Sequence, residues 1–223
     1  MGKQAELFEV PLFPLNVVLF PGMALPLHVF EPRYREMIEH CLADNAPFGV
    51  VLVSEINDAG EDIPARVGTL ARIISYKRLP DGRYNLLTRG MKRFELVELR
   101  RDRPYLVGRV RPLADTELIS PDMDAAVAEA QRVLRDYFAT LTALVGVEHQ
   151  EIHVPTDPTD LSFVIGMCLT CEDCDKQTLL EMTSVPQRLR AGTRMVEMEM
   201  RVLSAENDTD PRPPTPGDPT KFN

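Results

Sequence analysis

The 223-residue chain is predicted to be an α+β protein, in which a β-rich half precedes a helical half. Short runs of β-branched and aromatic residues, bounded by Pro, Asn, Asp and Gly, fill most of residues 1–115. From residue 116 onward, apolar residues recur at the three- and four-residue spacing of amphipathic helices. Residues 206–223 are rich in Pro, Asp and Thr, which is typical of a disordered tail. We therefore expect a β domain over 1–115, a helical bundle over 116–205 and a tail.

The first strands are expected to be short, and they cover residues 8–13, 17–20 and 24–30. Pro21-Gly22 has the composition of a turn between the second and third of these runs. Pro26 lies inside the third run and indicates that this strand lies at a sheet edge or beside a bulge. The reason is that proline has no N–H to donate to a central ladder.

A single helix is expected to follow Pro32, because proline is tolerated in a first helical turn where its missing N–H would have no partner. The residues that form one apolar stripe on this helix are Tyr34, Met37, Ile38, Cys41 and Leu42. A continuous apolar strand is expected at 48–55, followed by a polar loop.

Residues 67–113 are expected to form an antiparallel meander. Its runs are VGTLARIISYKRL, RYNLLTRG, MKRFELVELR and YLVGRVRPL. Pro80-Asp81-Gly82 predicts a tight turn, because Pro presets φ and Gly tolerates a positive φ. Short runs joined by tight turns favour a small antiparallel barrel or sandwich over a parallel sheet.

The helical half is expected to open with a long helix that Ser120 caps, with Pro121 at its first position and Gly146 at its end. Three shorter helices are expected from Asp160 to Leu169, from Asp175 to Met182, and from Ser184 to about Ala205.

Charge is distributed unevenly between the two halves. The net charge of −9 divides into +1 over residues 1–115 and −10 over residues 116–223. The chain has neither a signal-peptide pattern nor an apolar run of about 18 residues, so we expect a cytoplasmic protein with no membrane partner.

No enzyme motif is found in the sequence. The P-loop, G-x-G-x-x-G, H-E-x-x-H and G-x-S-x-G patterns are all absent, and the histidines are scattered. We therefore expect no catalytic activity and no cofactor.

Three cysteines, Cys168, Cys171 and Cys174, have a spacing that zinc or an iron–sulfur cluster could use. A fourth ligand would have to come from elsewhere, for example Cys41 or His153. The alternative is that Cys168 and Cys171 are small apolar residues at a helix end, and we therefore expect no metal site.

A basic stretch at 77–111 raises the possibility of RNA binding, because eleven Lys and Arg residues face four acidic ones there. Aromatic residues are interleaved with these cations, as on nucleic-acid platforms. On a meander, however, the same cations could simply occupy outward positions that keep strand edges from aggregating.

The segment PLFPLNVVLFPGMALPLHVFEPRYREM, at 11–37, closely resembles the opening of the N-terminal, substrate-binding domain of the Lon protease family. DGRYNLLTRGMKRFEL at 81–96 and LSFVIGMCL at 161–169 match later parts of that domain in the same order. The resemblance covers roughly 10–205. It implies a PUA-like β pseudo-barrel joined to a helical bundle.

The resemblance also implies a function. In the Lon family this domain precedes an ATPase domain and a Ser–Lys protease domain, and neither is present in this sequence. We therefore expect a stand-alone, non-catalytic module that binds unfolded or exposed polypeptide segments or a partner protein; the alternative is RNA binding through 77–111. The sequence indicates no oligomeric state.

A groove between barrel and bundle is the expected binding site. The candidate residues are Phe20, Met23, His28, Glu31, Arg33 and Arg93. The alternative for most of these residues, Phe20 and Met23 especially, is a place in the core.

Overall fold

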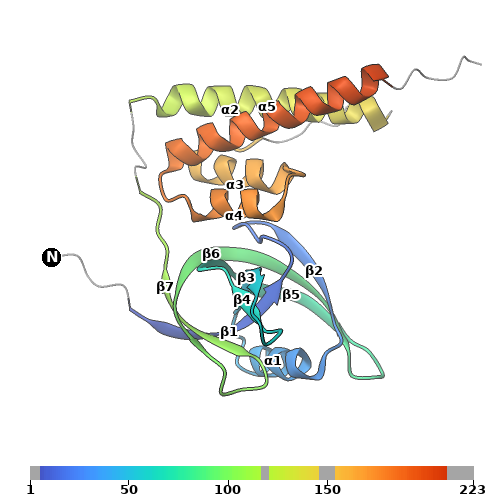
Figure 1. The fold of residues 1–223 in the computed structure, drawn as a ribbon, viewed down its shortest axis with the longest axis vertical. Helices are drawn as coiled ribbons and strands as arrows, with labels where there is room; N and C mark the ends of the chain where they lie inside the picture. The colour runs from blue at the N-terminus through green and yellow to red at the C-terminus, as the bar shows by residue number, and fades with distance from the viewer. Residues whose placement is uncertain (1–5, 117–120, 146–153, 210–223) are drawn as a thin grey trace, which may run out of the picture.

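A β-barrel and a helical bundle make up the computed structural model, which describes residues 6–116, 121–145 and 154–209 (Figure 1). The predicted α+β class is confirmed. In chain order the elements are β1 (Phe8–Leu15), β2 (Ala24–Val29), α1 (Pro32–Ala43), β3 (Phe48–Ile56), β4 (Asp62–Pro64), β5 (Val67–Arg78), β6 (Tyr84–Arg100), β7 (Leu106–Pro112), α2 (Met123–Val145), α3 (Pro158–Cys168), α4 (Asp173–Glu181) and α5 (Val185–Thr209).

The barrel is a ring of strands in the order β1-β7-β6-β5-β3, closed by pairing of β3 with β1. This closing ladder is parallel and runs from Leu12↔Gly49 to Leu15↔Leu52. The other pairings among the described strands are antiparallel, as expected. Parallel strands need a long crossover connection, and β2 and α1 supply it between β1 and β3.

β6 is one long strand, whereas the sequence suggested two runs that meet near Gly90. One edge of β6 pairs with β5, and the other is shared by β2 near the start of β6 and by β7 near its end. Because β2 pairs only with β6 among the described strands, it is an edge strand, and the prediction from Pro26 is confirmed.

The strand expected at 17–20 is not formed, and this prediction was wrong. Val18, Leu19 and Phe20 belong to no ladder, although each is at most 2% exposed. Val18 and Phe20 pack into the core beneath the bundle, and Leu19 packs into the core between the barrel and α1. The apolar run therefore reflects burial in two cores rather than sheet pairing.

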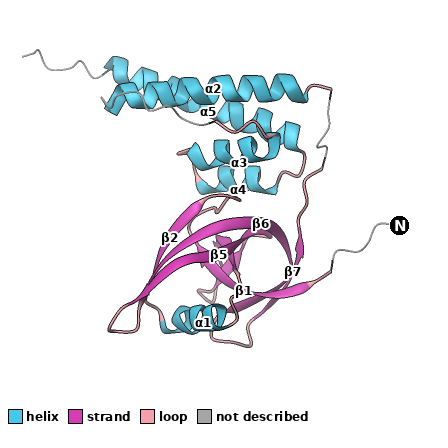
Figure 2. Cartoon of the chain, turned by 180° about the vertical axis from the view of Figure 1, so that it is seen from behind, coloured by secondary structure: helices cyan, strands magenta, loops and turns pink. Residues whose placement is uncertain are grey.

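Helix α1 begins at Pro32 as predicted and buries Tyr34, Met37, Ile38 and Cys41. It lies at the end of the barrel that faces away from the bundle (Figures 1 and 2). Its buried face packs against the inner side chains of β2, β5 and β6.

The bundle has two layers (Figure 2). Helices α3 and α4 rest on the barrel, and the long pair α2 and α5 covers them from the far side. α2 begins at Met123, while the expected caps Ser120 and Gly146 lie outside the described residues. α5 ends at Thr209, past the boundary predicted at 205, and the division of the chain into domains stays a prediction.

Within the described part of the chain, none of the helices combines the length and the apolar character needed to cross a membrane.

Gly90 allows the segment before β2 to cross β6 at close range. A Cβ at this position would overlap the Phe20 carbonyl oxygen and would lie 3.2 Å from Leu19 Cγ. The backbone here is also tied down, since Gly22 N donates to Gly90 O and Gly90 N donates to Met23 O, both at 2.9 Å.

We predict that Gly90→Ala lowers the free energy of unfolding by about 1–3 kcal/mol, because the overlap is with backbone that cannot move aside. Urea denaturation followed by circular dichroism measures this change. Lys92→Ala, at an exposed position on the same strand, is the control and should shift stability by less than about 0.5 kcal/mol. Equal stability of the two variants would contradict the crossing geometry.

Candidate functional site

Two arginines that share one carboxylate connect the barrel to the bundle, and we call this arrangement the barrel–bundle joint. Arg93 of β6 donates to Asp115 Oδ1 at 2.6 Å, and Arg188 of α5 donates to the same oxygen at 2.7 Å. Both arginines also donate to the Met182 carbonyl, at 2.7 and 2.6 Å, and Arg93 donates to the Leu180 carbonyl. Their side chains are 2% and 0% exposed, so the joint is a buried ionic group.

The remaining contacts of the joint come from α3. Arg188 Nε donates to Ser162 Oγ at 2.8 Å, and the Phe163 ring lies 4.2 Å from the Arg188 guanidinium and 5.4 Å from that of Arg93. Burial lowers the pKa of Arg93 to about 10, and Asp115 opposes this shift. Arg93 therefore stays charged at neutral pH and serves as a structural cation.

A small cleft opens beside the joint, at the position where the sequence predicted a groove. Its volume is about 420 Å³, and its walls come from β6, from the segment after β7 and from α3. Arg93 and Asp115 form part of the wall, but their charges are already paired. Lys92 is the exposed cation of this cleft.

The six residues predicted for the site fall into separate places. Phe20 is buried beneath α3, with its ring centroid 6.4 Å from that of Phe163, and Arg93 belongs to the joint. Met23 is half-buried between two cores. The other three residues lie at the opposite end of β2: His28 is in β2, Glu31 precedes α1 and Arg33 is in its first turn.

His28, Glu31 and Arg33 are partly or fully exposed. His28 Nδ1 lies 2.6 Å from Asn85 Oδ1, and Arg33 forms a 2.9 Å ion pair with Glu31. Thus the fold does not assemble the six residues into one cleft. Their role in binding stays a prediction.

An exposed surface that the sequence did not predict is the solvent side of β2, of residues 72–77 in β5 and of residues 84–89 in β6, and we call it the outer sheet face. The inner side of these strands packs on α1. On the outer side, Leu87 is 41% exposed and Ile74 is 55% exposed, and Phe30, which directly follows β2, is 59% exposed. Strand alternation in NLLTR at 85–89 could have revealed this surface, because it places Leu87 outward between Asn85 and Arg89.

A second apolar surface lies on α5, where a hollow of about 790 Å³ is lined by Met195, Met198, Val202 and neighbouring residues. Met198 is 64% exposed and Val202 is 57% exposed. Flexible methionine side chains can adapt to partners of different shape.

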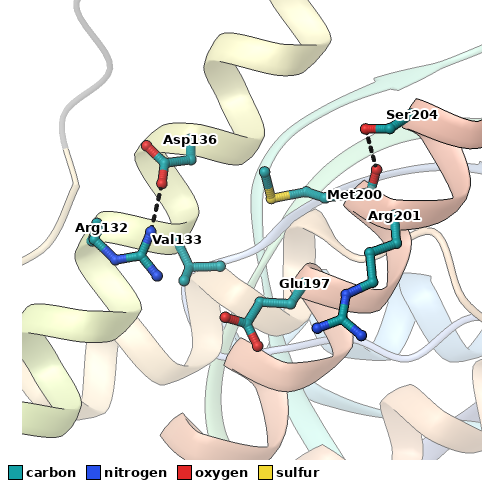
Figure 3. Close-up of a pocket in the computed structure, with 7 residues that line it drawn as sticks. All are labelled: Arg132, Val133, Asp136, Glu197, Met200, Arg201 and Ser204. Carbon is teal, nitrogen blue, oxygen red and sulfur yellow. Dashed lines mark hydrogen bonds and ion pairs between the residues drawn. The ribbon is translucent and has the colours of Figure 1, made fainter. Parts of the chain in front are cut away.

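Between α2 and α5 a further hollow, of about 430 Å³, is lined mainly by charged side chains (Figure 3). Arg132 forms a 2.8 Å ion pair with Asp136, and Ser204 Oγ donates to the Met200 carbonyl at 2.9 Å. The serine hydroxyl is therefore engaged by its own helix, and this hollow has the character of a helix–helix groove.

The three closely spaced cysteines do not form a ligand cluster. Among the described residues, no group of three or more His, Cys, Asp or Glu side chains is placed to hold a metal ion. Burial raises the pKa of Cys168 to about 11 and also raises that of Cys171, so both thiols are protonated at neutral pH. Cys41 is buried in α1, and His153 lies outside the described residues.

Most cations of the basic stretch at 77–111 are neutralised within the chain. Seven of the eleven form ion pairs with carboxylates. The seven are Arg78, Arg83, Arg93, Arg100, Arg101, Arg109 and Arg111. The stretch is therefore far less electropositive than its composition suggests.

Comparison with known proteins identifies the family of this chain. The family model of the ATP-dependent protease La (LON) substrate-binding domain matches residues 9–197. The chain belongs to this family. The similarity covers the Lon substrate-binding region and does not extend to the protease or ATPase domains.

Lon proteins of several bacteria are similar to this chain. Lon protease 1 of Hydrogenovibrio crunogenus is 29% identical over 97% of the chain, and this match covers 27% of the relative. Lon protease of Anaeromyxobacter dehalogenans is 25% identical over 90% of the chain, which corresponds to 24% of that relative. The chain thus spans about a quarter of the length of these Lon proteases.

Solved structures of Lon N-terminal domains share the fold. The crystal structure of a Lon N-terminal domain protein from Xanthomonas campestris has a TM-score of 0.59 and 28% identity, over 82% of this chain and 95% of that one. The N-terminal domain of the Mycobacterium avium complex Lon protease has a TM-score of 0.67 and 20% identity, over 85% and 98%.

We predict that Asp115→Asn lowers the free energy of unfolding by about 3–5 kcal/mol, because it leaves two buried guanidiniums without a counter-charge. Urea denaturation measures the loss. Glu98→Gln is the matched control. It removes a carboxylate from an exposed ion pair with Arg109 and should cost less than about 1 kcal/mol. The joint would lose its assigned role if both substitutions had the same small effect.

Proposed function

We propose that this chain is a non-catalytic module that binds unfolded or exposed polypeptide segments. The observation that carries the proposal is the gathering of large apolar side chains on the outer sheet face. Phe30, Ile74 and Leu87 are each more than 40% exposed there. Single exposed apolar residues are common on any protein, but several on one face are typical of interaction sites.

Family membership supports the same proposal. The matched family model describes a substrate-binding domain, and substrates of a protease are polypeptides. The proposed role is therefore to bind a polypeptide, and chemical modification of that polypeptide is not part of it. A folded partner protein with an apolar surface is the second kind of occupant that such a face could accept.

RNA binding is the less favoured function. In the basic stretch at 77–111, seven of the eleven cations form ion pairs within the chain. RNA affinity depends chiefly on cations that are free to replace the counterions of the phosphate backbone.

We predict that the protein binds a fluorescein-labelled polypeptide kept unfolded by reduction and carboxymethylation, and that fluorescence anisotropy detects this complex. Ile74→Ser combined with Leu87→Ser should weaken it by about tenfold, because two apolar contacts are lost.

The matched control is Ile56→Ser combined with Val97→Ser. These side chains are 68% and 50% exposed but lie outside the outer sheet face, so their replacement should leave affinity unchanged. If Met198→Ser combined with Val202→Ser abolished binding instead, the site would be the hollow on α5. Absence of any binding by the wild-type protein would refute the proposed function.

We predict that single-stranded oligo(U) at low salt binds no more tightly to this protein than to an unrelated protein of similar negative charge. A gel-retardation titration tests this expectation. Tight binding that falls steeply with added salt would restore the RNA alternative.

A further inference from the structure

Two arginines lie directly opposite each other on the outer sheet face. Arg72 of β5 pairs in register with Arg89 of β6, and both side chains are exposed. Like charges at directly opposite positions of an antiparallel pair repel each other. Neither guanidinium forms an ion pair with a carboxylate of the described residues, and Arg89 Nε donates only to the Gly22 carbonyl, at 3.2 Å.

Other arginines of the same sheet form ion pairs with carboxylates. On the β6–β7 ladder, Arg109 forms an ion pair with Glu98 at 2.9 Å, and Arg111 forms one with Glu95 at 2.6 Å. Each of these cations therefore has a carboxylate on the neighbouring strand. The Arg72–Arg89 pair is an exception within one barrel, and it lies on the face that also exposes large apolar side chains.

The strand segments that form this face carry no carboxylate of their own. β2, β5 and residues 84–94 of β6 contain no Asp or Glu. The chain as a whole carries a net charge of −9, so the cationic character of this face runs against the overall balance.

Cations lie at both ends of the face, with apolar side chains between them. Lys77 pairs in register with Asn85, beside His28, at the end opposite the two arginines. Leu87 lies midway between Asn85 and Arg89 near the start of β6, and Ile74 is the extra residue of the bulge that faces it. Side chains on one face of a strand repeat about every 6.8 Å, which is also the repeat of an extended ligand.

We propose that the outer sheet face binds extended polypeptide segments in which an apolar residue is flanked, two positions away on each side, by Asp or Glu. The apolar side chain contacts Leu87 and Ile74. One carboxylate lies between Arg72 and Arg89, and the other lies near Lys77. This inference rests on the proposed function and specifies the class of polypeptide that it selects.

The segment lies on the face and does not extend the sheet at the free edge of β2. Because Gly90 N donates to the Met23 carbonyl, the ladder pattern turns the backbone of residues 25, 27 and 29 toward β6. Residues 24, 26 and 28 then face the free edge, and Pro26 has no N–H at the centre of that edge. An added strand would lose its central hydrogen bond.

Two short fluorescein-labelled peptides test the proposal. One has the central sequence Asp-Ser-Leu-Ser-Asp and the other has Lys-Ser-Leu-Ser-Lys. We expect the wild-type protein to bind the acidic peptide at least about tenfold more tightly, and Arg72→Glu combined with Arg89→Glu to reverse this preference. Fluorescence anisotropy at low and moderate salt measures both affinities.

The matched control is Arg135→Glu combined with Arg194→Glu. Both residues are exposed on the bundle, so the net charge changes equally while the outer sheet face stays intact. The control should keep the acidic preference within about twofold, since distant charges are screened. Circular dichroism of each variant confirms that a lost preference does not come from unfolding.

The possible outcomes separate this inference from the proposed function. If unfolded polypeptide binds but the double reversal leaves peptide preference unchanged, the inference is wrong and the proposed function stands. If oligo(U) binding, and not peptide binding, requires Arg72 and Arg89, the face is a phosphate site and the inference is wrong. If the wild-type protein binds neither peptide nor unfolded polypeptide, both are wrong.

Discussion

The arrangement of the two halves depends on one partly buried carboxylate, Asp115, which two buried arginines share. Asp115 accepts hydrogen bonds from Arg93 of the barrel and Arg188 of the bundle, and the same arginines donate to the carbonyl of Met182. Burying two guanidiniums is costly unless each is paired. The shared carboxylate therefore favours one orientation of the two halves, because a displacement of Arg188 relative to Arg93 would separate at least one guanidinium from Asp115. Phe163 and Phe20 then fill the space around it.

The barrel–bundle joint lies at one end of the barrel, and the outer sheet face lies apart from it. The inner side of the β2–β6–β5 sheet packs against α1. The outer side is not needed for this packing, so it can hold residues that a buried sheet face would exclude. The facing arginines repel each other, and exposed Leu87 and Ile74 leave apolar surface in water. None of the elements in the described part of the chain packs against this face, and that is the physical basis for proposing it as a recognition surface.

Local sequence signals predicted local structure well. Pro32 marked the start of α1, Gly82 adopts the positive φ expected of its turn, and Pro26 identified an edge strand. The joint could not be found in this way, because Arg93 and Arg188 are distant in sequence and nothing in either neighbourhood indicates a partner. The sequence predicts Phe20 and Arg93 as binding residues, whereas the fold buries both. Burial decides that role, and burial depends on contacts between remote segments.

The closure of the barrel has a consequence for how the chain folds. β1 pairs with β7, so Phe8 meets Val110 across about half the length of the chain. During synthesis from the N-terminus, β1 has no antiparallel partner until β7 has left the ribosome. Such distant pairing makes folding slow and leaves apolar strand residues exposed in the meantime. A protein that belongs to a substrate-binding family thus passes, while it is being made, through a state that resembles the unfolded chains it is proposed to bind.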